Sequence, residues 1–391
     1  MLRSFLPVGQ GAFYLEQFNS NVDRVNVVYD CGSLTDVKIV QKAIRSNFSK
    51  DEEIEIVFIS HVDQDHINGL EYLLKYCNVK KIVFPYTKIK DKTALTIDYF
   101  CNSNNPSNND FIYKFINNPY LALRDLDSEA RLYGIAEFNE DNEDNESYRI
   151  IDYDNEKVEI IRSGVNLFEF FISDKFPYKI KWEYIPFNFR EDKRKNQFFD
   201  ELENNLNKLG IRLKEMGVDN ILKLWVNPDI QNAIKESYKK VRGSLNTNSM
   251  VLFSGIRDTN IIQRQINLYN NYFYCCLRRY GNCFCCRNKK SGCLYTGDYE
   301  AGGKQKWSEL KKAYSKYWDY IGCVQIPHHG SYKNYNKEFA LFDAYFIISS
   351  GLNNRYRHPS GSVIKNLLLN NKYLQIVTEQ QSSEAILKID I

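Results

Sequence analysis

The sequence lacks any long apolar run. No stretch approaches the roughly 18 residues that a membrane-spanning helix needs, and Met1–Pro7 shows no signal-peptide pattern. An excess of charge of one sign is also missing, because 52 lysines and arginines oppose 49 aspartates and glutamates, for a net charge of +3. We therefore expect a soluble, cytoplasmic protein with no membrane partner. The balance argues against a strongly basic nucleic-acid binder, although it leaves room for a local basic groove.

Cysteine is unevenly distributed along the chain. Six of the ten cysteines lie within Cys275–Cys293. In a cytosolic chain such a cluster is more often reduced or metal-bound than paired in disulfides. Because the cluster lacks a clean Cys-x2-Cys pair repeated at zinc-site spacing, we expect a β-hairpin with a basic edge. A small structural zinc site is the alternative.

The pattern of elements divides the chain into three stretches. The 391 residues have room for two or three average domains, or for one large domain with an insertion. Strands and helices alternate over residues 1–85: Thr35 is placed to cap a helix at Asp36–Phe48, and Ile54–Ser60 has the pattern of a strand buried on both faces. Residues 87–245 are rich in asparagine, charge and tyrosine. Strand patterns then return at Ser249–Phe253, Cys293–Thr296, Gly322–Ile326, Ala344–Ser350 and Tyr373–Thr378.

This division predicts a mixed α/β (α+β) fold. Two halves rich in βα units, separated by an irregular stretch, favour an αββα sandwich with a large insertion. We expect residues 1–86 and 246–391 to form the core. Residues 87–245 are expected to form an insertion or cap that lies near the active site and influences the choice of substrate.

Histidine is scarce, and its positions share one feature. Each of the five histidines lies at the C-terminal end of a predicted apolar strand or in the loop after it: His61, His66, His328, His329 and His358. Open α/β sheets place ligand-binding residues at the carboxyl ends of their strands. A histidine at a random position is more often an ordinary surface or core residue, so this shared placement indicates a functional site.

The run His61-Val-Asp63-Gln-Asp65-His66 combines imidazole and carboxylate groups at short spacing. In an extended loop His61 and Asp63 can converge on one ion, and Asp65 and His66 can turn toward a second. Such ligands suit Zn²⁺, Mn²⁺ or Fe²⁺. The alternative is a polar loop whose aspartates only cap the next helix.

These motifs resemble the metallo-β-lactamase superfamily, in particular the nuclease domain of bacterial competence DNA-uptake proteins and its soluble relatives. The resemblance covers residues 1–85 and roughly 246–391. Besides the His61–His66 run, it is carried by motifs in the family's order: Val8-Gly9-Gln10-Gly11, Asp30-Cys31-Gly32, Asn246–Leu252, Thr296-Gly297-Asp298, Pro327–Ser331 and Asn354–Pro359.

The resemblance implies roles for residues of the second half. Asp298, which alone would be an ordinary β-turn aspartate, is expected to bridge two cations. His328, His329 and His358 are expected to ligate metal or to protonate a leaving group, and the sequence does not say which does which. Ser331 is expected to hold a phosphate oxygen. The motif at Asn354–Pro359 places Asn354 and Tyr356 among the substrate-binding residues.

The sequence departs from the best-known branch of the superfamily. Asp63 replaces the commoner histidine, and no histidine lies between His66 and His328, so the usual third histidine ligand is absent. The ligand set is therefore rich in oxygen, which favours Mn²⁺ without excluding Zn²⁺ as the two divalent cofactors. The same change favours phosphodiester chemistry over β-lactam hydrolysis.

The favoured function is that of a two-metal phosphodiesterase or nuclease. A hydroxide bridging the metals would attack phosphorus, with Asp65 and the later histidines as catalytic residues, and with a nucleic acid or nucleotide as substrate. The competence proteins carry a membrane channel that this sequence lacks, so DNA uptake itself is not expected. Two alternatives remain: a hydrolase of small esters, lactones or thioesters, and a regulatory or defence-system binding protein that uses the fold as a scaffold. The sequence does not show a protein partner.

Overall fold

The computed structural model describes most of the chain. The described residues are 1–390 without 20–23, 88, 104–105, 108, 139–147, 154–155, 177–180, 191–192, 213–224, 226, 242–244, 246–248, 259–262 and 267–289. Much of the cysteine cluster lies outside these residues; Cys293 is described and is buried.

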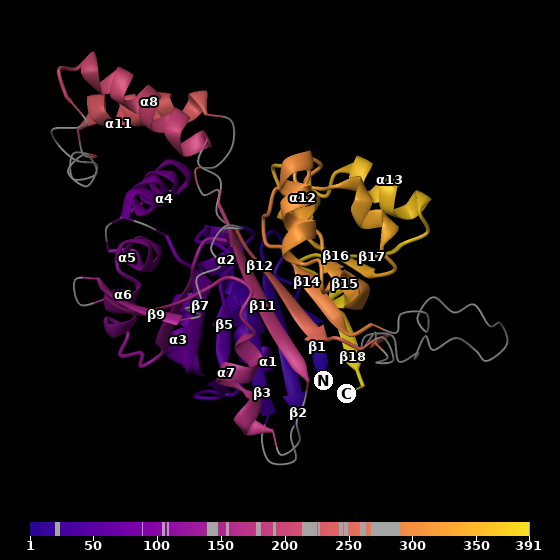
Figure 1. Ribbon diagram of the computed structural model, residues 1–391. Helices are drawn as coiled ribbons and strands as arrows, with labels where there is room; N and C mark the ends of the chain where they lie inside the picture. The colour runs from indigo at the N-terminus through magenta and orange to yellow at the C-terminus, as the bar shows by residue number, and fades with distance from the viewer. Residues whose placement is uncertain are drawn as a thin grey trace.

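Two large β-sheets form the centre of the molecule (Figure 1). The first sheet has the order β13-β18-β1-β2-β3-β5-β7-β8-β10-β9. Its strands are β1 (Leu2–Phe5), β2 (Phe13–Asn19), β3 (Arg24–Cys31), β5 (Ile56–Phe58), β7 (Lys81–Pro85), β8 (Arg131–Ile135), β9 (Tyr148–Tyr153), β10 (Glu156–Ile161), β13 (Gln263–Ile266) and β18 (Ala385–Ile389). Strands β3, β5, β7, β8 and β10 are parallel neighbours.

The second sheet has the order β11-β12-β14-β15-β16-β17. Its strands are β11 (Trp182–Phe189), β12 (Ser249–Ile256), β14 (Gly292–Tyr295), β15 (Ile321–Gln325), β16 (Tyr345–Ser349) and β17 (Tyr373–Val377). The last four are parallel. A separate short pair joins β4 (Glu53–Ile54) to β6 (Asn78–Val79).

Helices cover the outer faces of both sheets (Figure 1). On the first sheet lie α1 (Val37–Asn47), α3 (Leu70–Tyr76), α4 (Ile89–Asn102), α5 (Phe111–Asn117) and α6 (Pro119–Arg124); on the second lie α12 (Lys304–Ala313) and α13 (Gly361–Leu369). The remaining helices are α2 (Gln64–Ile67), α7 (Leu167–Phe171), α8 (Lys193–Asn207) and α11 (Pro228–Lys240). Short 3₁₀ turns lie at η1 (Ser173–Lys175), η3 (Trp318–Tyr320), η4 (His328–Gly330), η5 (Lys337–Leu341) and η6 (Gln381–Ser383).

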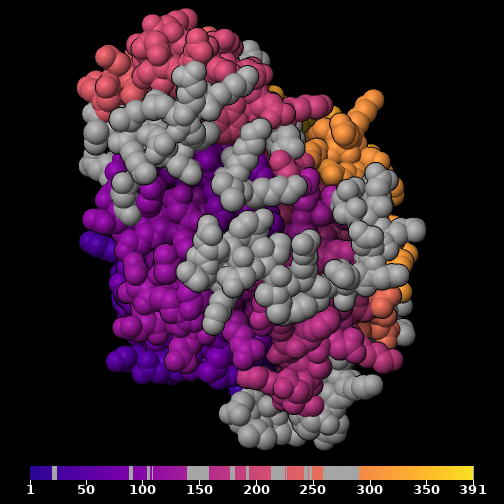
Figure 2. All heavy atoms as spheres, turned by 60° about the vertical axis from the view of Figure 1, so that its left-hand side comes forward, coloured from indigo at the N-terminus to yellow at the C-terminus, as the bar shows by residue number. Residues whose placement is uncertain are grey.

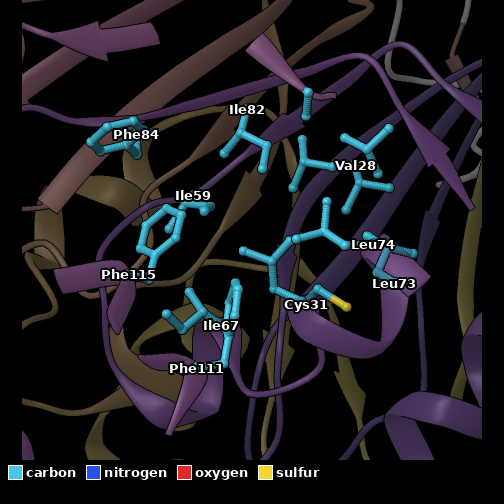
Figure 3. Packing of buried hydrophobic residues seen from close by; sticks show 14 of the residues in the cluster. Val28, Cys31, Ile59, Ile67, Leu73, Leu74, Ile82, Phe84, Phe111 and Phe115 are labelled. Atoms are coloured by element: carbon cyan, nitrogen blue, oxygen red, sulfur yellow. The ribbon is translucent and has the colours of Figure 1, made fainter. Parts of the chain in front are cut away.

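The apolar side chains form separate layers, as an αββα sandwich requires. In β5, Val57 packs toward the helices on the outer face, whereas Ile56 and Phe58 pack between the two sheets. Figure 3 shows the outer layer, in which Val28 and Ile82 of the sheet face Leu73 of α3. Full burial of one such aliphatic side chain stabilises the fold by about 1.5–3 kcal/mol. The predicted α/β sandwich, including a strand buried on both faces before His61, is therefore confirmed.

Local details differ from the sequence-based expectation for α1. The helix begins at Val37, and Asp36 is its N-cap because its carboxylate accepts a hydrogen bond from Lys38 N. The hydroxyl of Thr35, the expected cap, instead accepts a hydrogen bond from Gln10 N. Both threonine and aspartate are good N-cap residues. Here the Thr35 hydroxyl is engaged by the Gly9–Gly11 turn, so Asp36 caps the helix.

The stretch 87–245 contains two kinds of structure. Strands β8, β9 and β10 extend the first sheet beyond β7, and β11 pairs with β12 of the second sheet, so these strands belong to the sandwich itself. The boundaries at residues 86 and 246 therefore do not follow the edges of the sheets. Helices α4, α8 and α11 share a separate apolar cluster, and Figure 2 shows α8 and α11 as a raised mass at one end of the molecule. We call these three helices the helical cap; its influence on the site stays a prediction.

Candidate metal centre

The histidines gather at the carboxyl ends of strands from both sheets. His61 and His66 follow β5 of the first sheet, whereas His328 and His329 follow β15 of the second. The short helix α2, which contains His66, lies at this end of the sheets between α4 and α12 (Figure 1). Parallel strands bring their carboxyl ends to one edge, so residues more than 200 positions apart in the sequence meet here.

A buried carboxylate and a serine orient two of the histidines. Asp30, fully buried at the end of β3, accepts hydrogen bonds from His66 Nδ1 at 2.8 Å and from Ser60 Oγ at 2.7 Å. Because the Ser60 hydroxyl donates to Asp30, it accepts from His61 Nδ1 at 2.9 Å. Both imidazoles thus carry their proton on Nδ1, which leaves the lone pair of each Nε2 directed at the site.

The aspartates of the motif loop are not used as helix caps. Asp63 occupies the N-cap position of α2, yet its side chain makes no capping hydrogen bond, and Asp63 Oδ2 lies 3.4 Å from His61 Nε2. The loop is packed tightly on the turn at Gly32, where an added Cβ would lie 2.6 Å from the backbone of Asp65 and His66. A glycine is therefore required at position 32 for close approach rather than for its dihedral freedom.

Asp298 is held by a turn that the second sheet supports. Gly297, with φ of 52°, turns the chain after β14, and Gln325 Oε1 accepts hydrogen bonds from the backbone N–H groups of Thr296 and Gly297 at 2.7 and 2.9 Å. Asn334 Nδ2 donates to the carbonyl oxygen of Asp298 at 2.9 Å. These bonds fix the Asp298 backbone and aim its carboxylate at the histidines.

His328 and His329 lie in a turn with left-handed backbone at both residues, with φ of 49° and 54°. Such backbone costs on the order of 1 kcal/mol per non-glycine residue and is characteristic of functional sites. His329 Nδ1 donates to Ser349 O at 2.8 Å, so its Nε2 faces Asp65 Oδ2 at 3.0 Å. His328 Nδ1 lies 3.3 Å from Asp298 Oδ2, and its side chain is 40% exposed.

The distances arrange the ligands around the two oxygens of Asp298. Oδ2 lies 3.7 Å from His61 Nε2, whereas Oδ1 lies 3.3 Å from His66 Nε2. Two sets of donor atoms lie close enough for one ion each: His61, His66 and Asp298, and also Asp65, His66 and His329. Because one Nε2 binds one ion, His66 can serve only one of the two sets at a time.

Three buried donor atoms of this cluster fit a cation. His61 Nε2, His66 Nε2 and Asp298 Oδ1 make no hydrogen bond within the described residues. A buried polar atom without a partner costs about 1–3 kcal/mol, and native proteins rarely leave three side by side. Lone pairs of imidazole and carboxylate that converge in this way are the donor set of a divalent metal ion.

The electrostatics of the cluster also favour positive charge. Burial opposes the ionisation of Asp65, but His66 and His329 lower its pKa to about 2. Burial alone would lower the pKa of His66, yet the carboxylates of Asp30 and Asp298 raise that pKa well above its usual value. The carboxylates remain ionised and attract protons to the imidazoles, and the same field attracts a cation.

The pKa values of other groups in the cluster are also shifted in favour of ionised carboxylates and protonated imidazoles. Burial opposes ionisation of Asp298, but His328 and His66 hold its pKa well below the usual range. The pKa values of His61 and His329 are raised against the effect of burial, by neighbouring aspartates. A metal ion that binds to these imidazoles would therefore displace protons from them.

Residues 17–99 match the family model of the Metallo-beta-lactamase superfamily. The matched segment contains β3, Asp30 and the complete run from His61 to His66. A solved structure, unliganded yeast PDE1, resembles the chain with a TM-score of 0.42, 10% sequence identity and 99% coverage of both chains. No curated protein matches the sequence. The described helices include none that is long and apolar enough to span a membrane.

The metallo-β-lactamase match, the sandwich and the converging donor atoms support a metal-dependent hydrolase. The superfamily generally binds divalent metals, and the donor groups of this chain suit such ions. The narrower resemblance to competence nucleases is not shown by these comparisons and remains a prediction.

The remaining predicted residues lie at the edge of the ligand cluster. The ring of His358 is 5.7 Å from that of His328, one side chain away from Asp298. Asn354 uses its amide inside its own loop, where it accepts from His358 N and donates to His358 O; its predicted contact with substrate stays a prediction. Tyr356 is exposed, and Ser331 is buried directly after the His328–Gly330 turn.

Sequence reasoning missed the groups that orient the ligands. Asp30 was identified only as part of a turn, and Ser60 only as a strand end, yet both fix the ring nitrogens of the histidines. A usable signal exists for Asp30, because an acidic residue at the carboxyl end of a buried strand is expensive unless it has a partner. The carbonyl of Ser349, which orients His329, carries no signal in the sequence.

Proposed function

We propose that the protein is a two-metal phosphodiesterase that acts on a nucleic acid or nucleotide. The observation that carries this proposal is the position of Asp298, whose two carboxylate oxygens face different histidines, His61 and His66. A carboxylate so placed can hold two cations together, which is the arrangement used for phosphoryl displacement.

Two ligand groups would then share Asp298. His61 and Asp63 lie with Asp298 Oδ2 in one group, and Asp65, His66 and His329 lie with Oδ1 in the other. Bound divalent cations would supply Lewis acidity toward a phosphoryl oxygen and would lower the pKa of a water molecule at the site.

The protein's own groups would orient the ligands and transfer a proton. Asp30 and Ser60 accept hydrogen bonds from the Nδ1 side of His66 and His61 and so direct the Nε2 atom of each ring at the site. His328 is the candidate proton donor for the leaving oxygen, because its Nδ1 contacts Asp298 and its ring is exposed. His329 suits this task less well, since it is buried and both of its ring nitrogens are engaged.

The donor set supports Mn²⁺ or Zn²⁺ as the pair of cofactors. Three carboxylates (Asp63, Asp65 and Asp298) face three imidazoles (His61, His66 and His329). Carboxylate oxygen suits Mn²⁺, and imidazole suits Zn²⁺. We favour Mn²⁺ because Asp63 replaces the more usual histidine.

The test measures metal and turnover in the same preparation. Purified protein is analysed for bound metal, stripped with a chelator, and assayed on bis(p-nitrophenyl) phosphate after addition of Mn²⁺ or Zn²⁺. We expect turnover that returns with metal, and then cleavage of one substrate class among single-stranded DNA, duplex DNA, RNA and cyclic nucleotides. Metal binding without turnover of any phosphodiester would contradict the proposed function.

A further inference from the structure

The loop Leu352–Arg357, which we call the arginine–tyrosine loop, connects β16 to α13 beside the ligand cluster. Its backbone is held from inside by Asn354. The Asn354 amide accepts a hydrogen bond from His358 N at 2.8 Å and donates to the carbonyl oxygens of Gly351 and His358 at 2.7 and 2.6 Å. The loop is therefore a preorganised surface, which binds a ligand at a lower entropic cost than a flexible loop would.

This surface presents two arginines and a tyrosine to solvent. Arg355 and Arg357 are exposed, and Tyr356 is 48% exposed. Within the part of the chain that the structure describes, neither guanidinium has an acidic partner; Arg355 Nη2 donates to Tyr356 Oη at 2.5 Å. A guanidinium has five N–H donors in a planar fork that matches phosphate, so both arginines keep donors for an anion.

Acidic residues are missing from the sequence around this loop. Of the 391 residues 49 are acidic, yet none lies in 344–378, nor in 320–337, the segment that contains His328 and His329. Glu379, just beyond, accepts a hydrogen bond from Leu352 N at the base of the loop. Within these two segments the positive charge of the arginines and lysines is therefore not offset by acidic side chains, which favours the binding of an anion.

Ring contacts connect this surface to the ligand cluster. His328 Nδ1 lies 3.3 Å from Asp298 Oδ2, and the ring of His358 lies 5.7 Å from that of His328. The ring of Tyr356 stacks on His358 at 5.9 Å with an interplanar angle of 15°, and the guanidinium of Arg355 lies 4.8 Å from the Tyr356 ring. A phosphate on Arg355 would therefore lie next to, and not at, the metals.

We propose that the arginine–tyrosine loop binds the nucleotide adjacent to the scissile phosphate and that the substrate is single-stranded nucleic acid. Arg355 and Arg357 hold the neighbouring phosphate, and Tyr356 contacts the base. This inference rests on the proposed phosphodiesterase function. A base offers its face to a protein ring only when it is outside a duplex, and stacking of this kind tolerates any sequence.

The test compares substrates with and without a second phosphate. The double variant R355Q/R357Q is assayed with metal on a labelled oligothymidylate and on bis(p-nitrophenyl) phosphate. We expect kcat/KM on the oligonucleotide to fall by at least about ten-fold, as for loss of hydrogen bonds between charged groups. The generic diester should lose far less, so the ratio of the two efficiencies changes. In anisotropy titrations, the slope of log K against log salt should become shallower by about 0.7, the contribution of one phosphate on a single strand.

Arg45→Gln is the matched control. Arg45 also forms an exposed arginine–tyrosine pair, donating to Tyr72 Oη at 2.8 Å, but on α1 and α3. It should leave both activities and the salt slope unchanged. Equal loss on both substrates in R355Q/R357Q, or no loss on either, overturns the loop assignment, and tighter binding of duplex than of single strand overturns the substrate class. Absence of turnover by the wild-type protein on every phosphodiester refutes the phosphodiesterase function itself and is distinguishable from these results.

Discussion

Asp65 connects the motif loop to the second half of the chain. Its Oδ2 accepts from His329 Nε2, and its Oδ1 lies 4.0 Å from His66 Nε2. We predict that Asp65→Ala removes at least one metal and abolishes hydrolysis, because the remaining ligands of that group are too few. Metal analysis, turnover and circular dichroism check this. A folded variant with full metal content and activity would refute the two-metal assignment.

Asp30 controls the tautomer of His66 without contacting substrate. In Asp30→Asn, an amide N–H₂ would face His66 Nδ1, so the imidazole would keep its proton on Nε2 and lose its lone pair toward the site. Loss of such an orienting carboxylate typically weakens metal binding by about 10–100-fold. Titration calorimetry measures the affinity. The matched control is Asp51→Asn, at an exposed aspartate that also has positive φ; equal affinities in the two variants would contradict the role of Asp30.

Protons and metal compete for the same imidazoles. The pKa values of His61, His66 and His329 are raised by the surrounding carboxylates, so protons occupy these rings at pH values above the ordinary midpoint of about 6.5. Metal binding must displace these protons, and we predict that affinity increases as the pH rises from about 6 to about 8. Calorimetry in buffers of different ionisation enthalpy counts the released protons. A metal affinity that stays constant over this pH range, with no proton release, would contradict the predicted increase of affinity with pH.

The helical cap, together with Ser103 directly after α4, contacts both loops that carry the candidate metal ligands. Gln64, between Asp63 and Asp65, donates to Ser103 Oγ just after α4, and Arg194 of α8 pairs with Glu300, two residues after Asp298. These contacts connect the cap to both sides of the ligand cluster. A change in the packing of the cap is therefore expected to alter how a large substrate approaches the metals.

Leu202→Ala tests this connection. Leu202 is fully buried in the apolar cluster of the cap, and truncation of such a leucine costs about 2–5 kcal/mol of local packing. We predict a changed ratio of oligonucleotide to bis(p-nitrophenyl) phosphate turnover, with the metal content retained. Leu123→Ala, equally buried in α6 on the outer layer, is the control. The same ratio in both variants would leave the cap without influence on substrate choice.

Metal should also stabilise the molecule as a whole. The ligands come from both sheets, with His61 after β5 and Asp298 after β14, so a bound ion connects the two halves of the sandwich. A metal concentration of about 100 times Kd adds about 2.7 kcal/mol to the free energy of unfolding. We predict a higher Tm with Mn²⁺ or Zn²⁺ than after chelation, measured by scanning calorimetry. Asp65→Ala should lose most of this increase; an unchanged Tm in the wild-type protein would contradict a connecting ion.

The sequence alone determined the general class of fold and indicated the candidate metal ligands. The order of strands, and histidines placed where those strands end, can be read locally, because a buried parallel strand is a short apolar run and its C-terminal loop follows at once. The stretch 87–245 contributes strands to both sheets, and the sequence did not indicate this because no local pattern in the short strand Arg131–Ile135 identifies the strand with which it pairs. Its place in the sheet depends on pairing with β7, far away in the chain.

Only the tertiary structure decided which atoms act together. No local pattern states that Asp30 and Ser60 fix the tautomers of His61 and His66, or that Ser349 O orients His329, because these hydrogen bonds join different strand ends. The same holds for Asn354, whose side chain has the chemistry of a substrate ligand but satisfies the backbone of its own loop. Residue type sets what a group can bind, and packing sets which partner is within about 3 Å of it.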